Sequence, residues 1–319
     1  MQTESGEPQV TQGPLDTARR AALLTGAAGI MFAATSRASS DGDTGTQDPA
    51  QHLMRLLEDP AARARVRTKI VGSIAPETVY TFCRLHIYLW RNDGNLQPLY
   101  TLQNLSAATW RALPNGHYAA TQREAGVYTQ FDTDELLEQW RNPVTDDVRE
   151  PFHFRGGPIS IEIGPDGVIT GAGATLKPRS MRLDVLGDTV LLPTESAFSF
   201  PTPFKEQEWP KEAGDPTYYW DSPIFFAARI AEILDESVSF ARSVVQYQNL
   251  ISFHPWMGMG KTPGRTYGKA LGVKLGALAE LPVAVGALFE AKTPEIFDLS
   301  TWQPTREFGD YMQQWKPGA

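Results

Sequence analysis

The spacing of hydrophobic residues changes character near residue 77. Between residues 53 and 70 the apolar positions recur at helical spacing, and Asp59-Pro60 has the form of an N-cap followed by proline at the first position of a second short helix. From residue 79 to residue 90 the period becomes two, which is typical of a β-strand. The pattern therefore predicts a helical start followed by a long strand.

The two faces of this strand differ in kind. One face is small or aliphatic, whereas the other is mostly large and aromatic with hydrogen-bonding groups and carries Tyr80, Phe82, Arg84, His86, Tyr88 and Trp90. Such a face is not typical of a strand surface open to water. Two structural environments suit this face. It could line the lumen of a ligand-binding barrel, or it could be a sheet surface packed under a helix, where neighbouring residues form hydrogen bonds with Arg84 and His86. The sequence leaves both open.

The rest of the chain alternates strand-like segments with turn signals. Between residues 97 and 200, short strand-like runs are separated by Asn, Asp, Gly and Pro clusters and by no helical pattern, which indicates an antiparallel meander. Ser222-Pro223 then predicts a helix over residues 224–237, residues 243–253 read as another strand, and residues 280–297 read as a helix that closes before Pro294. We expect a mainly β chain with α additions, in which an antiparallel barrel is covered by C-terminal helices.

The N-terminus has the plan of an export signal. Arg19-Arg20 precedes a short apolar run and then the small-residue site Ser36-Arg37-Ala38, which suits a signal peptidase. The run is too short for a membrane span, which takes about 20 residues. We expect a twin-arginine signal peptide over residues 1–38, a disordered leader over 39–50 and a single barrel domain over 51–319, with helical segments at both of its ends. The alternative is an ordinary amphipathic helix. Export would make the protein periplasmic, without stable membrane insertion after cleavage.

Charge and cysteine content remove several classes of function. The net charge of -8 and the lack of a Lys/Arg cluster argue against nucleic acid as a partner. The single cysteine, Cys83, excludes an internal disulfide and a cysteine-based zinc site. The five histidines show no close metal-ligand spacing, although histidines from distant strands could still converge. We expect neither a metal nor a cofactor, and the oligomeric state is not readable.

The stretch HPWMGMGKT, residues 254–262, ends like a phosphate-binding loop. In that loop a glycine must stand where this chain has Pro255, which lacks the N–H that a phosphate needs. We interpret the stretch instead as a strand end that turns sharply at Gly258 and Gly260, with His254 and Trp256 closing one end of an aromatic pocket. The alternative is a corner between a strand and a helix, whose Trp and Met fill core.

Titratable groups in aromatic company are the remaining candidates for chemistry. On the strand near residues 117–128, Tyr118, Glu124 and Tyr128 share a face by even spacing, and we expect that face to line the lumen. The candidate catalytic residues are His86, His153, Tyr88, Tyr118 and Glu124, and the candidate ligand contacts are Tyr80, Phe82, Arg84, Trp90, Tyr128, Trp140, His254 and Trp256. For each histidine the alternative is a structural position in the core.

Two blocks of sequence resemble a known family. DTDELLEQWRNPVTDDVREPFHFRGGPI, with the motif W-x-N-P-x-T, and HPWMGMGKTPGRTYGKALGVKL, with P-W-M-G-M-G, are similar to the bacterial family called domain of unknown function 1838. The resemblance covers roughly residues 55 to 300 and implies a twin-arginine leader. The family is in turn similar in strand pattern to calycin-like barrels, which bind small apolar molecules and sometimes act as cofactor-free lyases or cyclases.

These observations lead to two functional hypotheses. The first is an exported, cofactor-independent lyase or isomerase that acts on a small aromatic or hydrophobic molecule, with proton transfer by tuned histidine, tyrosine or glutamate side chains. The second is a non-catalytic carrier for the same class of molecule, which needs no titratable group near its ligand.

Overall fold

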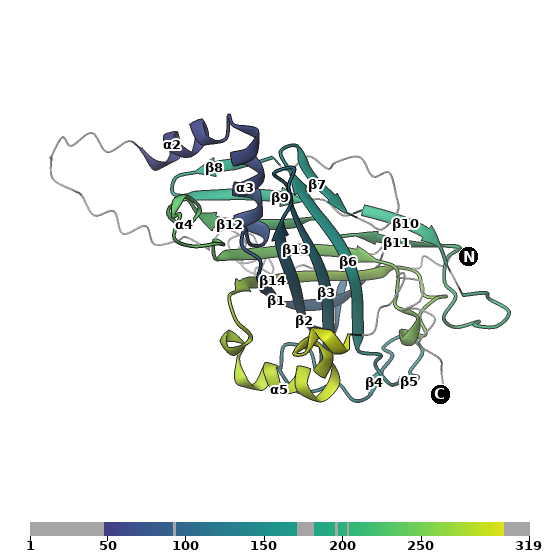
Figure 1. Cartoon of the computed structure of the whole chain (residues 1–319). Helices are drawn as coiled ribbons and strands as arrows, with labels where there is room; N and C mark the ends of the chain where they lie inside the picture. The colour runs from purple at the N-terminus through teal and green to yellow at the C-terminus, as the bar shows by residue number, and fades with distance from the viewer. Residues whose placement is uncertain (1–47, 92–93, 171–181, 195–196, 203, 303–319) are drawn as a thin grey trace, which may run out of the picture. The chain divides into compact units, whose positions relative to one another are not determined.

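A computed structural model of the chain describes residues 48–91, 94–170, 182–194, 197–202 and 204–302 (Figure 1). The predicted signal peptide, residues 1–38, and most of the leader lie outside these residues. The described part opens with two short helices, α2 (Pro49–Leu56) and α3 (Pro60–Val71). As the sequence predicted, Asp59 caps α3 by accepting hydrogen bonds from the N–H groups of Ala61 and Ala62, and Pro60 is the first helical residue.

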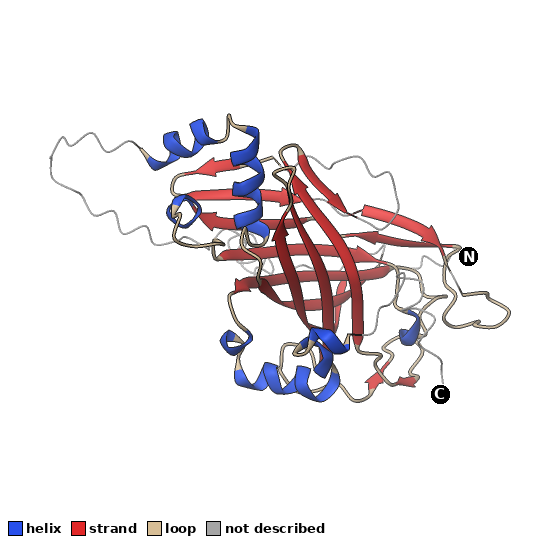
Figure 2. Cartoon of the chain, viewed as in Figure 1, coloured by secondary structure: helices blue, strands red, loops and turns tan. Residues whose placement is uncertain are grey.

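Most of the remaining elements are strands of one large sheet, shown in red in Figure 2. They are β1 (Thr78–Trp90), β2 (Leu96–Ala112), β3 (Tyr118–Thr129), β6 (Phe154–Gly164), β7 (Gly167–Thr170), β8 (Asp184–Leu186), β9 (Thr189–Thr194), β10 (Ala197–Pro201), β11 (Thr217–Asp221), β12 (Ile224–Arg229), β13 (Ser243–Ile251) and β14 (Arg265–Leu275). A separate small hairpin joins β4 (Trp140–Arg141) to β5 (Val148–Arg149), and the other helices are α4 (Ile230–Leu234) and α5 (Val283–Lys292).

The sheet is antiparallel and runs in the order β7-β6-β3-β2-β1-β14-β13-β12-β9-β8. It forms a curled half-barrel, and 44% of the described residues lie in strands. The prediction of a mainly β chain with a calycin-like antiparallel sheet and helices packed on it is therefore confirmed. No helix in the described part of the chain is long and apolar enough to cross a membrane.

The concave face of the sheet can be identified from its core. Leu85 and Leu89 of β1 belong to the same buried cluster as Val190 of β9 and Phe226 of β12, although β14 and β13 separate β1 from β12 in the sheet. Only a curled sheet lets side chains of such distant strands meet across its inner side. Ile70 of α3 joins the same cluster, so α3 packs on the concave side.

Helix α5 covers part of the opposite, convex face. Its Val285 and Phe289 are fully buried in a second cluster with Leu105 of β2 and Val127 of β3, and Phe82 of β1 packs against this cluster. In Figure 1, α5 lies in yellow-green below the strands β1 to β3. The prediction that a helix over residues 280–297 ends before Pro294 and packs on the sheet is confirmed.

One prediction of local structure in the last third of the chain is wrong, and one strand there was not predicted. Residues 224–229 form the strand β12 and not the start of a helix; only residues 230–234 are helical. The β-branched and aromatic residues of this segment satisfy a strand as well as a helix, and pairing with β9 and β13 decides the matter. Residues 265–275, to which the sequence pattern assigned no element, form the long central strand β14. Its inward glycines, Gly268 and Gly272, had weakened the alternating pattern.

Candidate functional site

The concave face is open at the middle of the sheet. In β2, the inward side chains of Leu102, Asn104 and Ser106 keep part of their surface accessible, whereas the outward Gln103 and Leu105 are buried. If the inner face were filled by core packing, its inward side chains would be buried and the outward ones accessible. The inner side of the half-barrel is therefore the candidate functional site.

Strand β1 turns its aliphatic side to this concave face and its aromatic side away from it. Cys83 and Leu85 are buried inward, while Tyr80 and Phe82 pack against the α5 cluster on the convex face. The sequence left two environments open for the aromatic face, the lumen of a barrel and a sheet surface packed under a helix. The structure shows the second of these. The side chains of Tyr80, Phe82, Arg84, His86, Tyr88 and Trp90 consequently do not line the concave face.

Neighbours on the convex face satisfy the polar groups of this aromatic side. Arg84 pairs with Asp134, and the Nε2 atom of His86 lies 3.0 Å from Oδ1 of Asp132. The ring of Tyr88 lies edge-on to Phe131, with a centroid distance of 5.4 Å. These contacts tie β1 to the loop after β3, which is a structural arrangement.

Glu124 of β3 does face the concave side, as the sequence predicted from its even spacing with Tyr118 and Tyr128. Pairing confirms the face, because Glu124 lies opposite Ser106 and Tyr128 lies opposite Leu102. Burial raises the pKa of the Glu124 carboxyl, although a hydrogen bond from the Gln122 amide partly opposes the shift. Glu124 is the only carboxyl on the concave side of β3, β2, β1, β14 and β13, five strands that the structure describes in full.

The Glu124 carboxyl lies near two other inward groups. Burial raises the pKa of the Cys83 thiol to about 12, and the negative charge of Glu124 adds to the shift. The Tyr247 phenol of β13 also has a pKa well above its usual value, because of burial and then of Cys83 and Glu124. Four strand spacings, about 19 Å along the sheet, separate β13 from β3. Their mutual influence shows how strongly the sheet curls.

An aromatic cluster closes one end of the concave face; it consists of Tyr100, Tyr128, Trp140 and Trp256. The Trp256 ring lies 5.5 Å from Tyr100, 5.1 Å from Tyr128 and 5.4 Å from Trp140, measured between centroids. All four side chains are buried. The structure thus brings together Tyr128, Trp140 and Trp256, all three predicted as ligand contacts, and Tyr100 is a member that the sequence did not single out.

Two histidines adjoin this end and are neutral at pH 7. His153 stacks on Tyr128 at 5.9 Å, and its Nδ1 accepts a hydrogen bond from the Tyr128 backbone N–H. Burial, with Lys292 and Arg155 nearby, lowers the pKa of His153 to about 4. Burial alone lowers the pKa of His254 to about 4.

Tyr118 lies on the same face of β3 as Glu124 but about 20 Å along the strand, where it packs against a separate cluster around Trp110.

Besides Nε1 of Trp110, which lies in the separate cluster at the far end of β2, two buried polar atoms at this face have no hydrogen-bond partner among the described residues. One is Oδ1 of Asn249, which is 7% exposed and faces inward from β13, and the other is Nε1 of Trp256, which is 1% exposed. The amide of Asn249 lies over Gly268, where a Cβ would stand 2.0 Å from Oδ1. Sequence reasoning missed Asn249 and Tyr247, yet their alternation with Ile251 in residues 243–253 would have placed them on one face.

The two blocks of sequence that resemble a family contact each other at the aromatic cluster. Asn142 donates a hydrogen bond from Nδ2 to the carbonyl of Met257, and its Oδ1 accepts from the N–H groups of Val144 and Thr145. Gly258 adopts a φ of 61°, and a Cβ there would lie 2.4 Å from Nη2 of Arg149. The motif residues therefore hold the wall around Trp256 in place.

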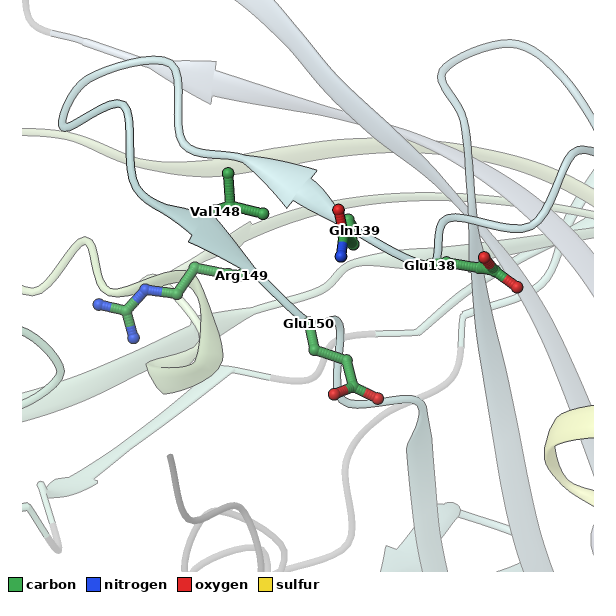
Figure 3. Close-up of a pocket in the computed structure, with 5 residues that line it drawn as sticks. All are labelled: Glu138, Gln139, Val148, Arg149 and Glu150. Carbon is green, nitrogen blue, oxygen red and sulfur yellow. The ribbon is translucent and has the colours of Figure 1, made fainter. Parts of the chain in front are cut away.

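A surface pocket of about 280 Å³ lies at the outer side of the β4-β5 hairpin (Figure 3). It is lined by Glu138, Gln139, Val148, Arg149 and Glu150. Its Arg149 is already paired with Glu212 at 3.0 Å, so the guanidinium serves the fold. None of the predicted site residues lines this pocket. Nor do the described residues contain a group of three or more His, Cys, Asp or Glu side chains placed to hold a metal ion.

Comparison with curated proteins finds no match. Comparison with protein families matches residues 77–307 to the family described as "Protein of unknown function (DUF1838)". The matched range includes all of the sheet, the aromatic cluster and Glu124. Because the match covers well over half of the sequence, the chain belongs to the DUF1838 family.

Proposed function

We propose that this protein binds a small hydrophobic or aromatic molecule on the concave face of its sheet and acts on it as a cofactor-independent lyase or isomerase. Glu124 is the group that transfers the proton. The aromatic cluster supplies an apolar wall at one end of the face, and the inward side chains of β2 leave the middle of the face accessible.

The observation that carries this proposal is the raised pKa of Glu124 at an accessible inner face. A carboxyl whose pKa is raised toward the working pH can both donate and accept a proton. In an isomerisation, the Glu124 carboxylate takes a proton from one substrate carbon and the resulting acid returns it to another. In an elimination, it takes the proton while the leaving group departs with the electron pair of its bond. Neither reaction needs an oxidant.

A non-catalytic carrier is the second candidate, and one observation favours it. Of the five residues predicted to be catalytic, His86 and Tyr88 lie on the convex face and Tyr118 lies far from Glu124 along its strand. His153 is held neutral with its Nδ1 already engaged. Glu124 would therefore work without a second titratable group from that set, which binding alone does not require.

The two candidates are separated by identifying the ligand and then testing Glu124. Native mass spectrometry of protein isolated from its own cells would identify a retained small molecule, and cell fractionation in the same preparation tests our further proposal of twin-arginine export to the periplasm. Recovery from the cytoplasm alone would contradict export.

Conversion of that molecule, or of a panel of aromatic compounds, is then followed with Glu124→Gln and with Glu290→Gln, a matched control on the exposed side of α5. An enzyme predicts a loss of turnover of about 100-fold or more for Glu124→Gln, with binding retained and the control unchanged. Binding without any turnover by the unmodified protein establishes the carrier, and equal turnover by both variants removes Glu124 from the chemistry.

A further inference from the structure

The concave face offers a ligand two hydrogen-bonding atoms that the fold itself does not use. Oδ1 of Asn249 is a buried acceptor and Nε1 of Trp256 is a buried donor, and neither has a partner among the described residues. A buried polar atom without a partner costs about 1–3 kcal/mol. Two such atoms on the same inner face as the aromatic cluster point to a ligand that supplies the missing partners.

The electrostatics of the face restrict the charge of that ligand. On the concave side of β3, β2, β1, β14 and β13, Lys274 is the only cationic side chain, and its ammonium group donates to the carbonyl oxygens of Lys69, Ile70 and Gly72. No cation on these strands is left to pair with a ligand carboxylate. A carboxylate buried without a cation is strongly disfavoured.

The two orphan atoms restrict the polar group of the ligand further. Oδ1 of Asn249 can only accept a hydrogen bond, so its partner must carry an O–H or N–H. A carboxylate and an ether have neither. The Trp256 indole can only donate, so its partner must be an oxygen or nitrogen with a lone pair. A hydroxyl group satisfies both requirements, and so does an uncharged carboxamide.

We propose that the ligand of the concave face is an uncharged aromatic molecule that bears a hydroxyl or a carboxamide. The O–H or N–H of this polar group donates a hydrogen bond to Oδ1 of Asn249, and its oxygen accepts one from Nε1 of Trp256. This inference rests on the proposed function, because it names the chemical class of the molecule bound at the same face. It makes Asn249 the residue that determines specificity, through a contact that turnover by Glu124 does not require.

The test is a matched series of ligands on one aromatic ring system: the hydroxymethyl compound, its methyl ether, the carboxamide and the carboxylate. Affinity is measured by calorimetry for the unmodified protein, for Asn249→Leu and for Gln246→Leu. Gln246 lies on the same strand but on its exposed, convex side, so it is the matched control.

The unmodified protein and the control are expected to bind the alcohol about tenfold more tightly than the ether, in line with one hydrogen bond. They should bind the carboxylate at least 100-fold more weakly than the carboxamide. In Asn249→Leu the difference between alcohol and ether should vanish, as a double-mutant cycle requires of a direct contact.

A second readout excludes a merely structural role for Asn249. Because Asn249→Leu removes an unpaired buried oxygen, the ligand-free variant should unfold at the same temperature as the unmodified protein or at a higher one. A large loss of stability would overturn the inference.

Equal binding of the alcohol and the ether by the unmodified protein would also overturn the inference, and so would tight binding of the carboxylate. Both results would leave the proposed binding of an aromatic molecule intact. If no member of the series and no ring hydrocarbon binds, the proposed function fails, and the inference fails with it.

Discussion

Glu124 illustrates at the residue scale how a group with a proposed role in function can oppose stability. Its folded-state pKa is raised because burial disfavours the ionised form. At a pH well below the ordinary value of 4.5, the carboxyl is protonated in both the folded and the unfolded chain and has no effect. As the pH rises above that value, the unfolded chain releases the proton first, so folding is destabilised.

We therefore expect Glu124→Gln to raise the stability of the protein at pH 8 and to change it far less at pH 4, where the carboxyl is mostly protonated in both states. The gain at pH 8 should appear because ionisation of the buried carboxyl opposes folding there. Chemical denaturation at the two pH values measures it, with Glu290→Gln as the control that should change nothing. A variant that is less stable at pH 8 would show that the ionised carboxylate is held by contacts that favour its charge.

At the scale of elements, Lys274 of β14 links the sheet to α3. Its side chain is 2% exposed, and Nζ donates to the carbonyl oxygens of Lys69, Ile70 and Gly72 at 2.6, 3.0 and 2.9 Å. The last carbonyls of a helix have no partner within the helix, and a cation there is favourable. The inward lysine thus closes the C-terminal end of α3 on the concave side.

Replacing Lys274 with methionine should lower the unfolding free energy by about 3 kcal/mol, because three buried carbonyls lose their hydrogen-bond donor. Methionine keeps an unbranched side chain of similar length, so little packing is lost. Lys269→Met on the exposed side of the same strand is the control, and its effect should stay below about 1 kcal/mol. Urea denaturation compares the two variants. Equal effects would mean that the carbonyls of α3 find other partners.

The elements that sequence patterns predicted are those whose signal is local. Asp59-Pro60 opens a helix through its own side chain and ring, and β1 alternates over its whole length. Strand β14 escaped prediction because glycines occupy its inward positions 268 and 272. The side chains that take that space, Asn249 and Cys83, come from neighbouring strands, which only the folded sheet brings alongside.

The candidate site was predictable in part for the same reason. Even spacing placed Glu124 and Tyr128 together on the inner face, because residues on one strand keep a fixed relation. It could not say which face of β1 points inward, because both faces of that strand suit a buried environment. That choice depends on α5, whose Phe289 lies some two hundred residues further along the chain and covers the convex side.

At the scale of the whole molecule, the wall around Trp256 depends on contact between two blocks about one hundred residues apart in the sequence. Arg149 of the first block pairs with Glu212 at 3.0 Å and lies against Gly258 of the second block. At Gly258 a Cβ would meet the guanidinium at 2.4 Å, and the backbone has a φ of 61°. Both conditions favour glycine at this position.

We expect Gly258→Ala to lower the unfolding free energy by about 3 kcal/mol, of which about 1 kcal/mol comes from the positive φ and the rest from displacing Arg149. Gly286→Ala is the control: nothing lies within 4 Å of a Cβ at this position in α5, and alanine should stabilise the helix by about 0.5–1 kcal/mol. The near-ultraviolet circular dichroism of the tryptophans should change in Gly258→Ala alone.

A double variant separates the two causes. If the clash with the guanidinium is real, Arg149→Ala should cost less in the Gly258→Ala background than in the unmodified protein, because the ion pair with Glu212 is already disturbed there. Strictly additive costs would show that the two blocks do not depend on each other through this contact. Coupling would mean that the two blocks together hold the aromatic end of the concave face in its folded geometry.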